Sequence, residues 1–324
     1  NIDNITLGDN VELTIDSTTV DTNLTIHTIT GGAGTEKVIV TSGNQDFEEV
    51  VFSLVENIDL TEASTAQAIV VDSATNFGSA AITGTQTSSA NDDNITSTSD
   101  MNLNGVVLTN MESVVLDSDN FGAGTGSGIV TSLFVDNLTR LNGASVVTGS
   151  TTRHTHITSN DGLFLEGSSL FVNSTTSEKN SIILDNDTSG ATTLTISSTT
   201  NVAAGGSTVI TEIRSVDGVA TGDEIISSND GMNLSNAELS GIANVNIEAD
   251  GGGAATLTIN AATKLALGVA TAITGNGGDD IVLLSGGGTF DFSADAGATL
   301  NNIGFITGGT GNDIVTVNNA LTGS

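Results

Sequence analysis

Three glycine-rich segments, each ending in an acidic residue and a branched apolar run, have the composition of a metal-binding turn. They cover residues 31–39, 275–283 and 308–316. Glycine lets the backbone turn tightly and direct carbonyl oxygens inward, while the acidic side chain adds carboxylate oxygen. Calcium binds six to eight such oxygens, so residues of these types could contribute ligands to a calcium ion.

The segments resemble the nonapeptide GGxGxDxUx of the repeats-in-toxin family, in which U is an apolar residue that anchors a short strand. Residues 308–316 match the pattern fully, residues 275–283 depart at Asn276, and residues 31–39 carry Glu36 in place of the aspartate. Weaker copies place Asp93 and Glu224 at the same position. The resemblance implies calcium bound between successive turns. In the family the copies are in tandem, whereas here they are isolated.

The acidic, glycine and polar residues of these copies are the candidate metal ligands. They are Glu36, Asp93, Glu224, Gly275, Gly277, Asp279, Asp280, Gly308, Thr310, Asn312 and Asp313. An ordinary solvated turn is the alternative, because glycine, asparagine and aspartate are favoured in turns without any metal. We favour metal binding for Asp280 and Asp313, and a plain turn for Glu36, Asp93 and Glu224.

Other reactive residue types give weaker signals. His154 and His156 form a His-x-His pair whose rings would share one face of a strand, as in a transition-metal site, but an exposed polar strand is the favoured interpretation. His27 is interpreted as a surface residue. The sequence has no GxSxG nucleophile elbow, so we predict no catalytic residue and no organic cofactor.

Charge excludes one class of partner. The chain has 38 Asp and Glu against six Lys and Arg, which gives a formal net charge of −32. A nucleic-acid partner would need clustered basic residues, and these six are scattered. Such a charge opposes compaction and lateral packing unless divalent cations or high salt are present.

Composition and residue patterning favour an all-β fold. Cysteine and proline are absent, and proline would interrupt a continuous stack of strands. Segments such as Val11–Ile15 alternate apolar and polar residues, as half-buried strands do. The chain begins at Asn1 without a signal segment or an apolar stretch long enough to span a bilayer, so we expect a mature product or a fragment.

An internal repeat sets the predicted organisation. An apolar-Thr-Gly triplet recurs at Ile29, Ile82, Val147, Ile273 and Ile306, with a degenerate copy at Ile210, mostly at spacings of roughly 53 to 65 residues. About twenty residues after the acidic position comes a second signature, as in Val55–Leu60 and Met111–Leu116. We predict an elongated β-solenoid resembling a parallel β-helix, with coils of about twenty residues and no substantial helix.

We expect one elongated β-repeat body over residues 1–324. Its approximate modules are residues 24–80, 81–144, 145–207, 208–270 and 271–324, each of roughly three coils.

The rest of the sequence is similar to bacterial S-layer and other cell-surface proteins that carry such calcium-binding repeats. This resemblance implies a secreted, extracellular structural protein, a subunit of a calcium-stabilised surface layer or filament. The expected partners are copies of itself in a lattice or filament, and a cell-envelope glycan or lipopolysaccharide. A calcium-dependent adhesin or biofilm-matrix repeat region is the alternative. A solenoid polysaccharide-degrading enzyme comes third, because the chain has few basic residues and neither Trp nor Tyr to hold a sugar.

Overall fold

The computed structural model describes a chain of short parallel strands. The described residues are 3–15, 26–41, 45–60, 67–85, 93–97, 99–116, 130–148, 154–159, 161–171, 180–184, 192–202, 211–215, 224–235, 237–247, 253–260, 265–266, 272–276, 279–292 and 299–317. Among these residues there are strands, turns and bends but no helix. The predicted all-β class is therefore confirmed.

Contacts divide the chain into two units. The first unit comprises Asn1–Ile157 with Phe171–Thr176, and the second comprises Thr158–Leu170 with Ser177–Ser324. In both units every pairing between described strands is parallel, and the chain passes from one sheet to the next before it returns to the first. This arrangement is a β-solenoid, as the repeat predicted.

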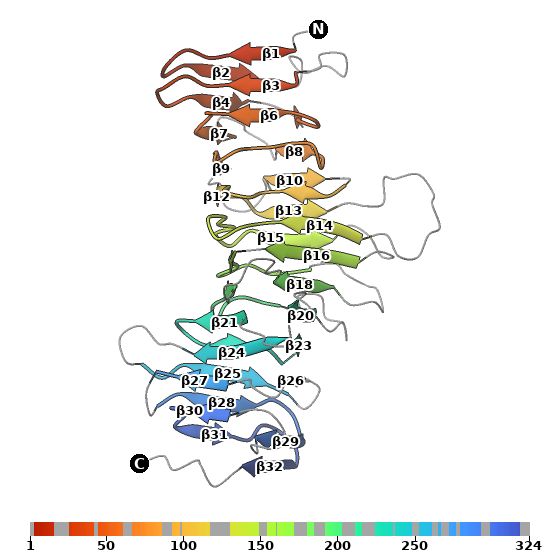
Figure 1. The fold of residues 1–324 in the computed structure, drawn as a ribbon, viewed down its shortest axis with the longest axis vertical. Helices are drawn as coiled ribbons and strands as arrows, with labels where there is room; N and C mark the ends of the chain where they lie inside the picture. The colour runs from red at the N-terminus through yellow and green to blue at the C-terminus, as the bar shows by residue number, and fades with distance from the viewer. Residues whose placement is uncertain are drawn as a thin grey trace. The chain divides into compact units, whose positions relative to one another are not determined.

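The first unit contains three sheets and one further strand pair (Figure 1). The first sheet holds β1 (Asn4–Thr6), β3 (Thr28–Thr30) and β6 (Val51–Ser53). The second holds β2 (Glu12–Ile15), β4 (Lys37–Val40), β7 (Asn57–Asp59), β9 (Ala81–Thr83) and β12 (Val107–Thr109). The third holds β5 (Gln45–Asp46), β8 (Ala68–Val71), β10 (Asn94–Ser97), β13 (Ser113–Leu116) and β15 (Ser145–Thr148). β11 (Met101–Asn102) pairs with β14 (Val130–Phe134), and β16 (His154–Ser159) follows.

The second unit repeats this plan. One sheet holds β17 (Leu163–Phe164), β19 (Thr193–Thr195), β21 (Glu224–Ser228), β24 (Ile242–Ile247), β27 (Ala272–Gly275) and β30 (Thr299–Asn301). Another includes β18 (Ser181–Leu184), β20 (Thr211–Ser215), β23 (Ala237–Ser240) and β26 (Leu265–Ala266). A third holds β22 (Met232–Asn233), β25 (Thr256–Ile259), β28 (Ile281–Leu284) and β31 (Phe305–Thr307), and β29 (Gly288–Phe292) pairs with β32 (Asp313–Val317).

In-register apolar ladders form the core. Ladder positions in the second sheet of the first unit are Val38, Ile58, Ile82 and Leu108, each fully buried. Alternation explains this burial, since every second side chain of a strand points to the inside of the coil. Because each coil buries its apolar face only against its neighbours, the core extends along the stack.

The repeat and the coil have different lengths. Thr28 is in register with Asn4 and with Val51, so these coils advance by 24 and 23 residues. Others vary more widely, from 19 residues between Asn94 and Ser113 to 32 between Ser113 and Ser145. Consequently one sequence module contains two coils and one further strand, rather than three coils. The apolar-Thr-Gly triplet therefore moves from the first sheet at Ile29 to the second at Ile82 and the third at Val147.

Candidate functional site

Each predicted acidic ligand lies where a corner of the coil leads into a strand. Glu36, Asp93 and Asp280 immediately precede β4, β10 and β28, while Glu224 and Asp313 are the first residues of β21 and β32. They belong to different coils, and the described residues contain no group of three or more His, Asp or Glu around one point. The structure thus places the predicted acids at equivalent corners rather than in one cluster.

Asp280 binds backbone amides at its corner. Its side chain is 2% exposed. Oδ1 accepts a hydrogen bond from the Ala255 N–H of the preceding coil at 2.9 Å, and Oδ2 accepts one from the Asn276 N–H of its own corner at 2.7 Å. Hydrogen bonds to a charged acceptor are among the stronger ones in proteins. The carboxylate therefore ties two coils together through the backbone.

Asp93 has the same arrangement. It is fully buried, Oδ1 accepts from the Gln67 N–H at 2.8 Å, and Oδ2 accepts from the Thr85 N–H at 2.6 Å. Both oxygens of Asp93 and of Asp280 thus have N–H donors, which stabilise the buried charge. Neither carboxylate requires a metal ion to be accommodated.

Glu36 differs from these two aspartates. It is also fully buried, and Oε1 accepts a hydrogen bond from the Asn10 N–H at 2.8 Å. Oε2, however, is buried without a hydrogen-bond partner. This oxygen lies 2.9 Å from the position that a Cβ on Gly31 would occupy. Of the predicted ligands, Glu36 therefore has a buried oxygen that fits a cation.

The remaining predicted ligands have mixed environments. Glu224 is fully buried, whereas Asp279, Gly308, Thr310 and Asn312 are exposed. Asp313 is half-buried; its Oδ2 lies 2.7 Å from the Cβ position of Gly308, and its Oδ1 has no hydrogen-bond partner. Gly275 is buried. Gly277 lies outside the described residues.

The glycine of each Thr-Gly triplet allows close approach by the next coil. A Cβ on Gly31 would overlap with the Leu54 carbonyl oxygen, one on Gly84 would overlap with that of Asn110, and one on Gly275 would lie 2.6 Å from that of Asn302. Leu54, Asn110 and Asn302 have φ of 55°, 53° and 53°, so each turns its carbonyl toward the glycine. Leu54 and Asn110 immediately precede the second sequence signature of their repeats. The two signatures therefore lie on adjacent coils, in contact at this corner.

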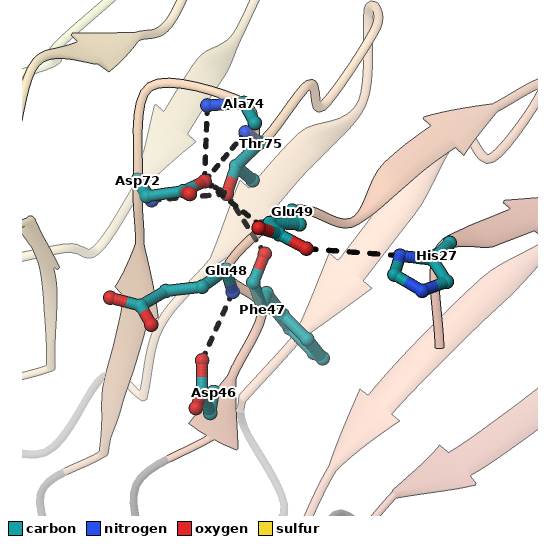
Figure 2. A network of polar contacts seen from close by, with 8 residues as sticks. All are labelled: His27, Asp46, Phe47, Glu48, Glu49, Asp72, Ala74 and Thr75. Carbon is teal, nitrogen blue, oxygen red and sulfur yellow. Dashed lines mark hydrogen bonds and ion pairs between the residues drawn. The ribbon is translucent and has the colours of Figure 1, made fainter. Parts of the chain in front are cut away.

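Sequence reasoning missed a second corner motif of the form Asp-x-x-Thr. Figure 2 shows one copy, in which Asp72 Oδ1 accepts hydrogen bonds from the Ala74 N–H, the Thr75 N–H and the Thr75 hydroxyl. The same oxygen accepts from the Glu49 N–H of the preceding coil at 2.9 Å, and the Thr75 hydroxyl donates to the Phe47 carbonyl. Asp72 and Thr75 thereby connect neighbouring coils.

Two further corners repeat this arrangement, one with Asp136 and the other with Ser197 in place of the aspartate. Asp136 and Thr139 make the equivalent bonds to the Gly105 N–H and the Leu103 carbonyl. Ser197 and Thr200 contact the Gly167 N–H, and Thr200 donates to the Leu165 carbonyl. The spacing of 64 and 61 residues between Asp72, Asp136 and Ser197 matches the module length, so aligning polar as well as apolar positions would have found the motif.

Hydrogen bonding at these corners shifts the pKa of two aspartates. Partial burial raises the pKa of Asp136, but the amides of Gly105, Thr139 and Leu138 and the Thr139 hydroxyl outweigh it and hold the pKa below its usual value. At Asp230, burial is outweighed in the same way, chiefly by the hydroxyl and amide of Ser198. Both groups therefore stabilise the fold in their ionised form.

The histidines belong to no group of three or more His, Asp or Glu within the described part of the chain. Thr155, between His154 and His156, is buried, and His156 is half-buried. His27 is exposed, as predicted, and its Nδ1 lies 4.0 Å from Glu49 Oε2 (Figure 2). An exposed pair at this distance contributes little to stability.

The fold and its corners define a class of protein, a parallel β-solenoid with apolar ladders inside and carboxylate-bonded corners. Comparison with known proteins adds no closer relationship: no family model, curated protein or solved structure matches the chain. No helix among the described residues is long and apolar enough to cross a membrane.

Proposed function

We propose that the chain is an extracellular structural protein, a subunit of a calcium-stabilised surface layer or filament that self-assembles. One observation carries the proposal: among the described residues, interactions that hold one coil to the next recur in both units. Ladders, Thr-Gly corners and Asp-x-x-Thr corners each join one coil to the next, so stability is distributed along the chain. Such a construction suits a scaffold under mechanical or chemical stress better than it suits a localised catalytic site.

Surface charge supports the calcium requirement. Exposed acidic residues gather near the Asp72 corner, where Asp46, Glu48 and Glu49 lie on the strand and turn below it (Figure 2). With a net charge of −32, neighbouring subunits would repel one another in low salt. Calcium ions bound to exposed carboxylates would remove this repulsion and allow lateral packing, whereas magnesium gives up its water less readily.

The experiment is controlled assembly. Purified chain is dialysed from EGTA into CaCl₂, or into MgCl₂ or NaCl of equal ionic strength, and examined by sedimentation velocity and electron microscopy. We expect ordered sheets or filaments with CaCl₂ only. A chain that stays monomeric in CaCl₂ contradicts self-assembly, and equal assembly in all three salts contradicts a specific calcium role. Depolymerisation of a polysaccharide in a parallel activity screen would contradict the non-catalytic assignment.

A further inference from the structure

The corner at Gly31 contains a buried negative oxygen that no donor reaches. Glu36 is fully buried, and its Oε2 has no hydrogen-bond partner, although its Oε1 accepts from the Asn10 N–H. A buried carboxylate oxygen without a compensating donor is costly. At the related corners this problem is solved by an amide: Asn276 N–H reaches Asp280 Oδ2 and Thr85 N–H reaches Asp93 Oδ2.

A second acceptor faces the same space from the next coil. The Leu54 carbonyl oxygen and Glu36 Oε2 are both among the nearest atoms to the Cβ position that Gly31 lacks. Leu54 is held with φ of 55°, a conformation that non-glycine residues rarely adopt and that points its carbonyl to this corner. Two acceptors therefore converge beside Gly31, and neither can donate a hydrogen bond to the other.

A second carboxylate lies at the same level. Glu56 is adjacent to Glu36 across the β4–β7 pair, since Lys37 is in register with Asn57. Glu56 Oε2 accepts a hydrogen bond from the Glu36 N–H at 2.7 Å, which fixes this carboxylate against the corner. Lys37, which follows Glu36 in the sequence, forms an ion pair with Asp59 across the same strand pair.

We propose that this corner binds one calcium ion between the coils of β3–β4 and β6–β7. Glu36 Oε2, the Leu54 carbonyl oxygen and the Glu56 carboxylate are its protein ligands, and water completes the six to eight oxygens that calcium takes. The site deepens, and rests on, the calcium dependence in the proposed function. It joins one glycine-rich corner to a coil that has no glycine-rich segment, so it needs no tandem copy of the motif. Gly31 is required because any side chain would occupy the space between the ligands.

The test is calcium binding by the dilute, unassembled chain. Isothermal titration calorimetry with CaCl₂ and thermal unfolding in CaCl₂ or EGTA are compared for wild type, Glu36→Gln, Glu56→Gln and the control Asp93→Asn. We expect Glu36→Gln and Glu56→Gln each to lose one calcium per chain and to lose most of the calcium-induced rise in unfolding temperature. Asp93→Asn should unfold at a lower temperature but keep the wild-type calcium stoichiometry and rise.

Several outcomes would overturn the site. The site would be contradicted if Glu56→Gln kept the wild-type calcium stoichiometry and the wild-type rise in unfolding temperature. This variant remains informative if Glu36→Gln fails to fold, because Glu56 is only half-buried. The site would also be contradicted if Asp93→Asn lost as much calcium binding as Glu36→Gln, since this would indicate a general effect of removing corner charges. Binding here is measured without assembly: a chain that binds at this corner yet stays monomeric keeps the site and contradicts the proposed function. If the wild-type chain assembles in CaCl₂ but Glu36→Gln binds calcium with wild-type stoichiometry, the proposed function stands and the site is contradicted.

Discussion

Replacing Asp280 by asparagine should destabilise the second unit without any involvement of calcium. Asparagine has nearly the same shape, but one of the two terminal groups of its side chain is NH₂ rather than an oxygen. Whichever way the amide is turned, its NH₂ faces either the Ala255 N–H or the Asn276 N–H, which now donate to Asp280 at 2.9 and 2.7 Å. The substitution therefore replaces one charge-assisted bond by two opposed donors.

The magnitude follows from the burial of this corner. A hydrogen bond to a charged group contributes about 1.5–3 kcal/mol, and a buried donor left unpaired costs about 1–3 kcal/mol. Because Asp280 is 2% exposed, water cannot replace the lost acceptor without opening the corner. We therefore expect the free energy of unfolding of the second unit to fall by about 3–5 kcal/mol.

The assay is urea unfolding followed by far-UV circular dichroism, in EGTA and again in CaCl₂. Asp279→Asn is the matched control, because it removes the same charge one position earlier from an exposed side chain. The loss in Asp280→Asn should be the same in both solutions, and Asp279→Asn should lie within about 0.5 kcal/mol of wild type. A loss seen only in CaCl₂ would make Asp280 a metal ligand, and no loss in EGTA would refute the role of the two amide bonds.

Two further predictions concern other corners. Gly84→Ala should destabilise the first unit by about 1–3 kcal/mol, because the new Cβ would overlap with the Asn110 carbonyl oxygen. Gly253→Ala is the control and should be nearly neutral, because its Cβ meets open space. Equal urea midpoints for the two variants would contradict the close-approach argument. Because the pKa of Asp136 is lowered in the folded state, its stabilising effect is present above the unfolded pKa of about 4 and is lost as the pH falls through the lower folded pKa. Asp136→Asn should therefore cost more stability at neutral pH than in acid. A cost that does not change with pH in the same urea assay would count against this linkage.

Local patterning made the coil predictable but left its length uncertain. Alternation in a segment such as Val11–Ile15 is a property of neighbouring residues, and it correctly gave a strand, β2, with one face more buried than the other. The number of residues per coil depends on which strands pair across about 20 to 30 intervening residues, and corner loops of different length change it without disturbing the ladder. The sequence repeat therefore revealed a module without showing that the module ends one strand beyond two complete coils.

The sequence by itself determined that the chain forms parallel strands with glycine-rich acidic corners, because residue type and spacing fix both features. Tertiary structure alone decided what each acid contacts. Asp93 and Asp280 accept two amide hydrogen bonds, whereas Glu36, at the equivalent position, leaves one oxygen beside the Leu54 carbonyl. The difference accompanies the extra methylene group of glutamate, since a left-handed residue of the next coil faces the glycine at all three corners. Such a partner lies about twenty residues away, beyond the reach of any local motif.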